Sequence, residues 1–131
     1  MENSRLPTLA RIEETQRSKR LWLLASSLVS NARMRNRRRK APFDLTPDWV
    51  HKRLLAGVCE ASGIPFELTD IGAKHPFQPS LDQISPGRGD TTNNVRVTCL
   101  IYNYAKSTFR HEDVVRFATE FQSRYADVIL P

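Results

Sequence analysis

The sequence is poor in cysteine and glycine and contains no long apolar run. Its two cysteines, Cys59 and Cys99, lie far apart, and neither has a partner at the C-x-x-C spacing of zinc sites. We therefore expect reduced thiols in the core, without a disulfide framework or a structural zinc ion. No stretch approaches the roughly 18 apolar residues that span a bilayer, and no signal-peptide pattern opens the chain. These absences predict a cytoplasmic protein that does not enter a membrane.

Acidic residues are the minority among the charges. The 131 residues include 20 Lys and Arg against 14 Asp and Glu, which gives a net charge of +6. Six positive residues fall within eight positions, with no acidic residue among them: Arg33, Arg35, Arg37, Arg38, Arg39 and Lys40. Such a cluster predicts a surface that binds the phosphates of a polyanion. The alternative is a solvated basic face that partly serves the negative end of a helix dipole.

The length suits one compact domain, residues 1–131. Residues 1–40 are predicted to form a long basic amphipathic helix, since no Gly or Pro interrupts the chain from Thr8 to Arg39. Thr46 and Pro47 are typical of a helix start, and Gly57 of its end. Residues 58–66 favour a short hairpin, and 69–79 a loop.

Alternating or β-branched residues predict two paired strands at 80–84 and 95–99. A short helix is expected at 100–106, and a C-terminal helix at 112–128 with its apolar residues on one face. The order of elements indicates an α+β fold in which a strand, a loop, a strand and a helix follow one another. No repeat or low-complexity linker divides the chain.

Several short motifs occur together in this chain. They are PFDLT (42–46), CEASGIPF (59–66), HPFQPSLDQI (75–84), NVRVTC (94–99) and NYAK (103–106). Jointly these segments resemble HNH-type (ββα-metal) endonucleases of the kind carried by bacteriophages. The resemblance implies a small ββα-metal core over residues 58–107, with the long basic helix and other helices flanking it.

The resemblance also implies roles for individual residues. Asp82 and Asn103 would ligate Mg²⁺ or Mn²⁺, which prefer oxygen donors, and Asn94 would hold the hairpin loop in shape. A strand carboxylate, a polar helix position and a turn asparagine are the alternative interpretations. The family's general base is a histidine directly after the strand aspartate, but here Gln83 stands at that position. His75 is a candidate replacement; otherwise it is a loop histidine held by its neighbours.

The implied partner is DNA, in the cytoplasm of a phage-infected bacterial host. Its backbone would be contacted by the six residues of the basic cluster and, near the cleft, by Arg88, Arg96 and Lys106. We expect a metal-dependent DNA endonuclease that hydrolyses phosphodiester bonds. The alternative is a catalytically weakened HNH-fold protein that only binds DNA or a protein. A third class is a DNA-binding protein unrelated to nucleases. Monomer and homodimer both remain open.

Overall fold

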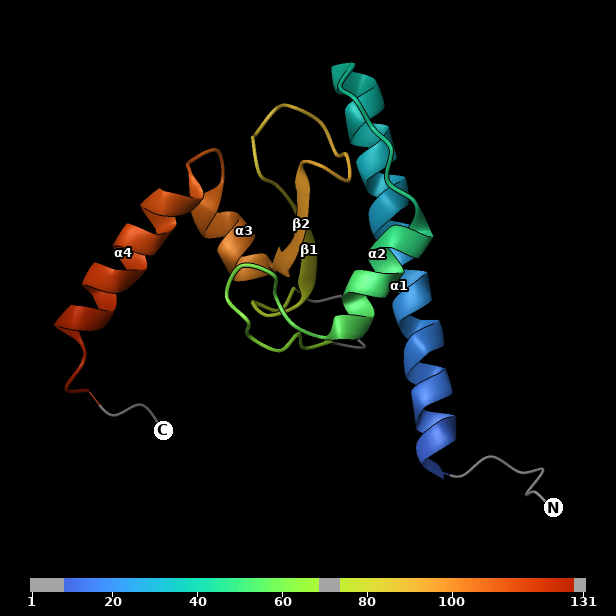
Figure 1. Cartoon of the computed structure of the whole chain (residues 1–131), viewed down its shortest axis with the longest axis horizontal. Helices are drawn as coiled ribbons and strands as arrows, with labels where there is room; N and C mark the ends of the chain where they lie inside the picture. The colour runs from blue at the N-terminus through green and yellow to red at the C-terminus, as the bar shows by residue number, and fades with distance from the viewer. Residues whose placement is uncertain (1–8, 69–73, 129–131) are drawn as a thin grey trace.

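Within residues 9–68 and 74–128, which the computed structural model describes, the chain forms four helices and one two-stranded sheet (Figure 1). The elements follow in the order α1 (Leu9–Arg39), α2 (Pro47–Ala56), β1 (Pro79–Gln83), β2 (Val95–Cys99), α3 (Leu100–Lys106) and α4 (His111–Arg124). This mixture of helix and sheet agrees with the predicted α+β class. The first eight residues of the predicted long helix and residues 69–73 of the predicted loop lie outside the described part.

The ends of the first two helices follow from local chemistry. Lys40 ends α1 with a left-handed φ of 56°, and the amide of Ala41 donates to the Asn36 carbonyl at 2.9 Å. Thr46 then caps α2, because its hydroxyl accepts from the Trp49 amide at 3.2 Å. Gly57 ends α2 in the left-handed conformation, with a φ of 81°. The predicted start and end of this helix are therefore correct.

The main core lies between α1, α2 and one face of the hairpin. Apolar side chains at helical spacing on α1 pack against α2 and β2 and lose nearly all exposure to solvent. The buried members of this cluster are Leu21, Ala25, Val29, Leu45, Val50, Leu54, Val95 and Val97. A smaller cluster holds Cys59, Cys99 and Tyr102. Burial raises the pKa of the Cys99 thiol, so this thiol remains protonated near neutral pH.

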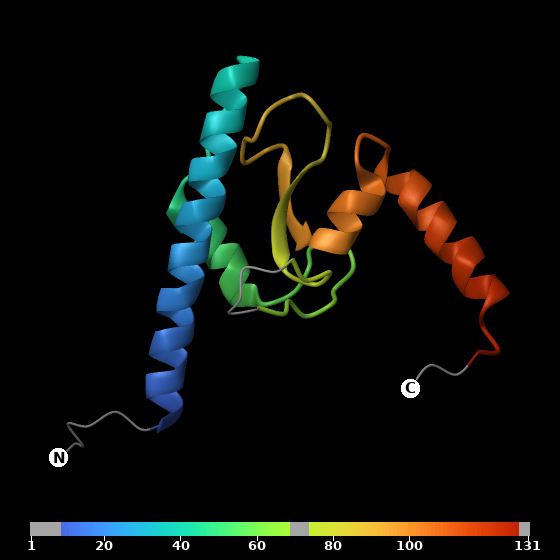
Figure 2. The same ribbon diagram turned by 180° about the vertical axis from the view of Figure 1, so that it is seen from behind.

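The strands β1 and β2 form an antiparallel hairpin in which Asp82 lies opposite Arg96. The loop between them extends beside the C-terminal half of α1, as the two opposite views show (Figures 1 and 2). There the carboxylate of Asp90 accepts a hydrogen bond from the Asn36 side chain of α1. Asn36 also accepts from the Asp90 amide at 3.1 Å. The end of the basic helix is thus fixed against the hairpin loop.

Helix α4 lies on the side of the hairpin away from α1 (Figure 2). The expected apolar face is present, but none of its residues is buried within the described chain. Phe117, Phe121 and Tyr125 stack in sequence, with ring centroids 5.7 Å and 4.8 Å apart. None of the described helices is long and apolar enough to cross a membrane.

Candidate functional site

A polar cleft lies where the basic end of α1 faces the hairpin and α3. We call it the α1–hairpin cleft. Its lining residues are Arg35, Arg39, Leu81, Asp82, Gln83, Pro86, Gly87, Asp90, Asn103, Ser107 and Thr108. The fold therefore brings Asp82, Gln83 and Asn103 together with two arginines of the basic cluster. The cleft combines carboxylates, amides and guanidinium groups.

The carboxylate of Asp82 is only 2% exposed and has a cation at each oxygen. The Lys106 ammonium nitrogen lies 3.1 Å from Oδ1, and the Arg96 Nη2 lies 3.4 Å from Oδ2. Lys106 is itself 0% exposed and donates a second hydrogen bond to the Gln83 carbonyl at 2.7 Å. A buried carboxylate requires such partners, because desolvation of an unpaired charge is costly.

Arg96 links Asp82 to the second core cluster. Its Nη2 also donates to the Tyr102 hydroxyl at 2.8 Å, and that oxygen lies 2.8 Å from His111 Nδ1. Burial raises the pKa of Tyr102, although the neighbouring Arg96 guanidinium acts in the opposite direction. The phenol therefore remains neutral at physiological pH.

Asn103 connects α3 to β1. Its amide nitrogen donates to the Ser80 hydroxyl at 3.1 Å and to the Leu81 carbonyl at 2.9 Å. These two bonds fix the Asn103 side chain at the wall of the cleft. Leu81 directly precedes Asp82 in β1. The predicted pair of oxygen ligands therefore lines one cleft.

Gln83 spans the base of the hairpin loop. Its side-chain nitrogen donates to the Asp90 carboxylate at 3.2 Å, and its side-chain oxygen accepts from the Gly87 amide at 2.8 Å. An amide has no basic lone pair at physiological pH, so Gln83 cannot take a proton from water. Its contacts are those of a residue that shapes the loop.

Asn94 closes the same loop from its other end. Its side-chain oxygen accepts from the Ser85 amide at 2.8 Å, and its nitrogen donates to the carbonyls of Ser85 at 3.1 Å and Gly89 at 2.8 Å. All three bonds go to the backbone of the loop. The geometry suits a residue that holds the loop in shape.

His75 lies at a different place from the cleft. Its Nε2 is 3.3 Å from the Glu67 carboxylate, and its Nδ1 accepts from the Phe77 amide at 3.1 Å. It lines a separate pocket with Pro76, Leu100 and other residues that are absent from the α1–hairpin cleft. The structure therefore does not bring His75 beside Asp82, since Glu67 and Phe77 hold it near the start of the hairpin.

The predicted phosphate contacts fall into two groups. Side chains exposed to solvent are those of Arg33, Arg37, Arg38, Arg39, Lys40 and Arg88. Arg35 is half-buried and lies 3.7 Å from the Asp90 carboxylate. Lys106 was expected to contact DNA, but its complete burial against Asp82 excludes direct contact in this conformation. Arg96 is largely committed to Asp82 and Tyr102 as well.

Sequence reasoning missed Asp90 and Asn36. Both are 2% exposed, and together they join the hairpin loop to α1. A signal for Asn36 was present, because it continues the apolar spacing of Ala25, Val29 and Ala32 and so had to be buried. Nothing in the local pattern distinguished Asp90 from an ordinary turn aspartate.

The HNH resemblance implies a divalent metal, so the donor set must be tested against one. Mg²⁺ prefers several oxygen ligands and a site of net negative charge. Among the described residues, no three His, Cys, Asp or Glu side chains could jointly hold a metal ion. Both oxygens of Asp82 already face cations. In this arrangement the residues of the cleft do not fit a resident divalent metal.

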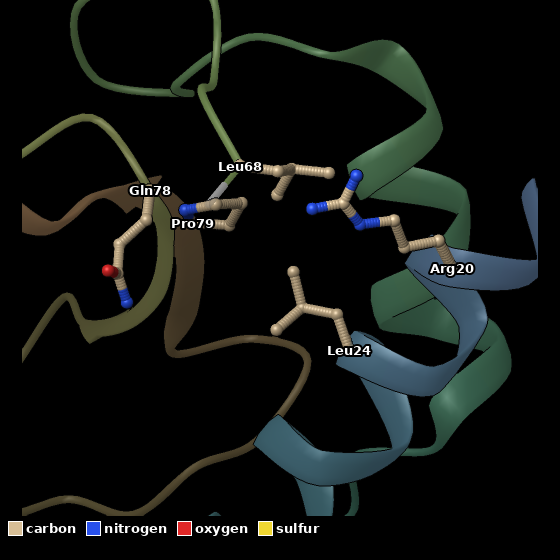
Figure 3. Close-up of a pocket in the computed structure, with 5 residues that line it drawn as sticks. All are labelled: Arg20, Leu24, Leu68, Gln78 and Pro79. Carbon is tan, nitrogen blue, oxygen red and sulfur yellow. The ribbon is translucent and has the colours of Figure 1, made fainter. Parts of the chain in front are cut away.

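A second hollow lies between α1 and the start of β1 (Figure 3). It is lined by Arg20, Leu24, Leu68, Gln78 and Pro79. Apart from the arginine and one amide its walls are apolar, and no predicted catalytic residue reaches it. Within the described part of the chain, Asp82, Gln83 and Asn103 lie in the α1–hairpin cleft instead.

Comparisons with known proteins agree with this geometry at the level of the fold. No family model matches the sequence, and no curated protein matches it. A solved structure of the rare-cutting HNH restriction endonuclease PacI is similar, with a TM-score of 0.56 and 16% sequence identity. The similarity covers 79% of this chain and 80% of the other. The fold is HNH-like. At this identity the likeness concerns the HNH-like fold alone.

Proposed function

We propose that this protein is a DNA-binding protein of HNH-like fold that holds backbone phosphates along α1 and in the α1–hairpin cleft, and that its hydrolytic activity is weakened or lost. The observation that carries the proposal is the complete pairing of Asp82 with Lys106 and Arg96. The carboxylate available for metal chemistry is thereby neutralised, while Arg39 remains exposed at the cleft. Gln83 at the position of the family's general base supports the same interpretation.

DNA as the partner is supported by three features together. The basic cluster at the end of α1 is exposed, and it lies directly beside the cleft. The similar structure is that of an endonuclease whose action perturbs DNA. Phosphate contacts of arginine do not depend on base sequence, so the surface provides affinity without assigning a recognition sequence.

A second candidate is the metal-dependent endonuclease that the motifs imply. The observation in its favour is that Asp82 and Asn103, the residues matching the family's ligands, line one cleft. For that function the ion pairs of Asp82 would have to rearrange. The two candidates differ in a single measurable property, which is divalent-metal-dependent cleavage.

Both candidates are tested by comparing DNA binding with DNA cleavage. Fluorescence anisotropy with a duplex oligonucleotide in EDTA should show binding, and Arg39→Ala should weaken it by about three- to tenfold, corresponding to about 0.7–1.4 kcal/mol. Arg124→Ala, at the exposed end of α4, is the matched control and should leave affinity unchanged. Absence of binding in EDTA would contradict the proposal.

Cleavage is measured on supercoiled plasmid with Mg²⁺ or Mn²⁺. We expect no nicking above the level of an EDTA control. Nicking that requires the metal and disappears in Asp82→Ala would establish the endonuclease instead. Retained nicking in Asp82→Ala would show that the cleavage does not depend on Asp82 and would contradict the endonuclease candidate.

A further inference from the structure

Lys106 is the most deeply buried charged side chain of the cleft region. We infer that Lys106 is the resident cation of the α1–hairpin cleft: it compensates Asp82 in place of a divalent metal, so a DNA phosphate binds there without one. The second half of this inference rests on the proposed function. The first half concerns Asp82 and Lys106 alone and can be tested without DNA.

The ammonium group of Lys106 is bound by neighbouring oxygen atoms inside the protein. Its side chain is 0% exposed, and its ammonium group lies 3.1 Å from Asp82 Oδ1 and 2.7 Å from the Gln83 carbonyl. An unpaired ammonium group could not remain buried, because desolvation would favour its neutral form. Asp82 and Lys106 therefore compensate each other's charge, and each is the condition for burying the other.

The charge around the cleft also disfavours a divalent ion. Arg35 and Arg39 line the cleft together with the buried carboxylates of Asp82 and Asp90, whereas Arg96 and Lys106 contact Asp82 without lining the cleft. Four positive side chains thus accompany two negative ones. A divalent cation would enter an already positive environment, whereas a phosphodiester would bring the negative charge that this environment lacks.

Replacement of Lys106 by methionine removes the charge while keeping an unbranched side chain of similar length. Among the described residues, Asp82 then keeps the Arg96 guanidinium, at 3.4 Å, as its counter-charge. The inference predicts that this single change raises the affinity of the Asp82 region for a divalent cation above that of the natural chain, because one of the positive charges that repel the ion is removed. If Lys106 had only a structural role, Lys106→Met would lower the stability of the protein without raising its affinity for a metal.

The experiment is titration of Mn²⁺ into DNA-free protein, followed by electron paramagnetic resonance of the unbound ion. Lys106→Met should bind Mn²⁺ at least roughly tenfold more tightly than the natural chain, a difference of about 1.4 kcal/mol. The double variant Asp82→Asn with Lys106→Met should return to the natural level, because it lacks the carboxylate. Equal binding by the natural chain and Lys106→Met would overturn the inference, as would full retention of Mn²⁺ in the double variant.

A second measurement needs only the natural protein, in case Lys106→Met does not fold. Its affinity for duplex DNA is compared in EDTA and in Mg²⁺ at matched ionic strength. The two affinities should agree within about threefold. A rise above roughly tenfold in Mg²⁺ would show that the cleft recruits the metal and would overturn the inference. Complete absence of DNA binding would instead contradict the proposed function, and the Mn²⁺ titration of the natural chain against Asp82→Asn would then test Lys106.

Discussion

At the scale of single residues, Gly89 shows how tightly the hairpin loop approaches the segment that leaves α1. Its φ is +94°, and a Cβ at this position would lie 2.2 Å from the carbonyl oxygen of Pro42. Both the backbone conformation and the close contact require glycine. The loop that carries Asp90 is therefore in close backbone contact with the segment that follows α1.

Substitution of Gly89 by alanine should lower the free energy of unfolding by about 2–4 kcal/mol, because backbone strain and overlap with Pro42 act together. Gly63→Ala is the matched control. That glycine also has a positive φ, +76°, but no heavy atom lies within 4 Å of its added Cβ. Urea denaturation should give a loss of only about 1–2 kcal/mol for the control. Equal losses in the two variants would show that contact with Pro42 is unimportant.

Individual site residues were predictable to different degrees. The placement of Asp82 and Asn103 in one cleft could be predicted, since a hairpin and the helix that follows it are close in sequence. The position of His75 could not, because it depends on contacts with Glu67 and Phe77 rather than on chain length to Asp82. The burial of Lys106 could not be predicted from the sequence either, because its partners on β1 come within reach only when α3 packs on that strand.

At the scale of elements, α1 and the hairpin loop are joined through one buried side chain. Asn36 donates to the Ala32 carbonyl at 2.7 Å and to the Asp90 carboxylate, and it accepts from the Asp90 amide. All of its polar groups are therefore satisfied inside the protein. This set of bonds fixes the part of α1 from which Arg35 and Arg39 reach the cleft.

Replacement of Asn36 by alanine should lower the free energy of unfolding by about 1–3 kcal/mol, since the Asp90 carboxylate and amide both lose a buried partner. Met34→Ala on the same helix is the control, because Met34 is 57% exposed and should change stability by less than about 0.5 kcal/mol. Thermal unfolding followed by circular dichroism measures both. A neutral Asn36→Ala would show that the loop is held by other contacts.

The elements themselves were predicted well where local chemistry defines them. Proline, threonine and glycine mark the ends of α2, and the alternating pattern gives β2 its observed bounds, Val95–Cys99. The C-terminal helix ends at Arg124 rather than at residue 128. Its amphipathic pattern correctly predicted one apolar face, but a pattern in one segment carries no information on whether another segment covers that face.

At the scale of the whole molecule, positive charge is concentrated on the side of α1 and the hairpin loop. The exposed members are the arginines at the end of α1, Lys40, and Arg88 in the loop. Helix α4, on the other side of the hairpin, carries acidic and basic residues in its own sequence. A polyanion should therefore approach the molecule from the α1 side.

The double variant Arg37→Ala with Arg38→Ala should reduce the salt dependence of DNA binding. If each arginine contacts one phosphate, the slope of log affinity against log salt should become shallower by about 1.8, since each neutralised phosphate contributes about 0.9. Arg116→Ala with Arg124→Ala on α4 removes the same charge elsewhere and should leave the slope unchanged. Equal changes in both double variants would indicate that net charge, rather than a defined surface, controls binding.

The bond between Asn36 and Asp90 also has an evolutionary consequence. The two positions are 54 residues apart in the sequence, yet each is the buried partner of the other. In chains descended from a common ancestor, these positions should therefore vary together rather than independently. An exchanged pair, with aspartate on the helix and asparagine in the loop, would preserve the side-chain hydrogen bond, whereas aspartate at both positions would place two carboxylates face to face.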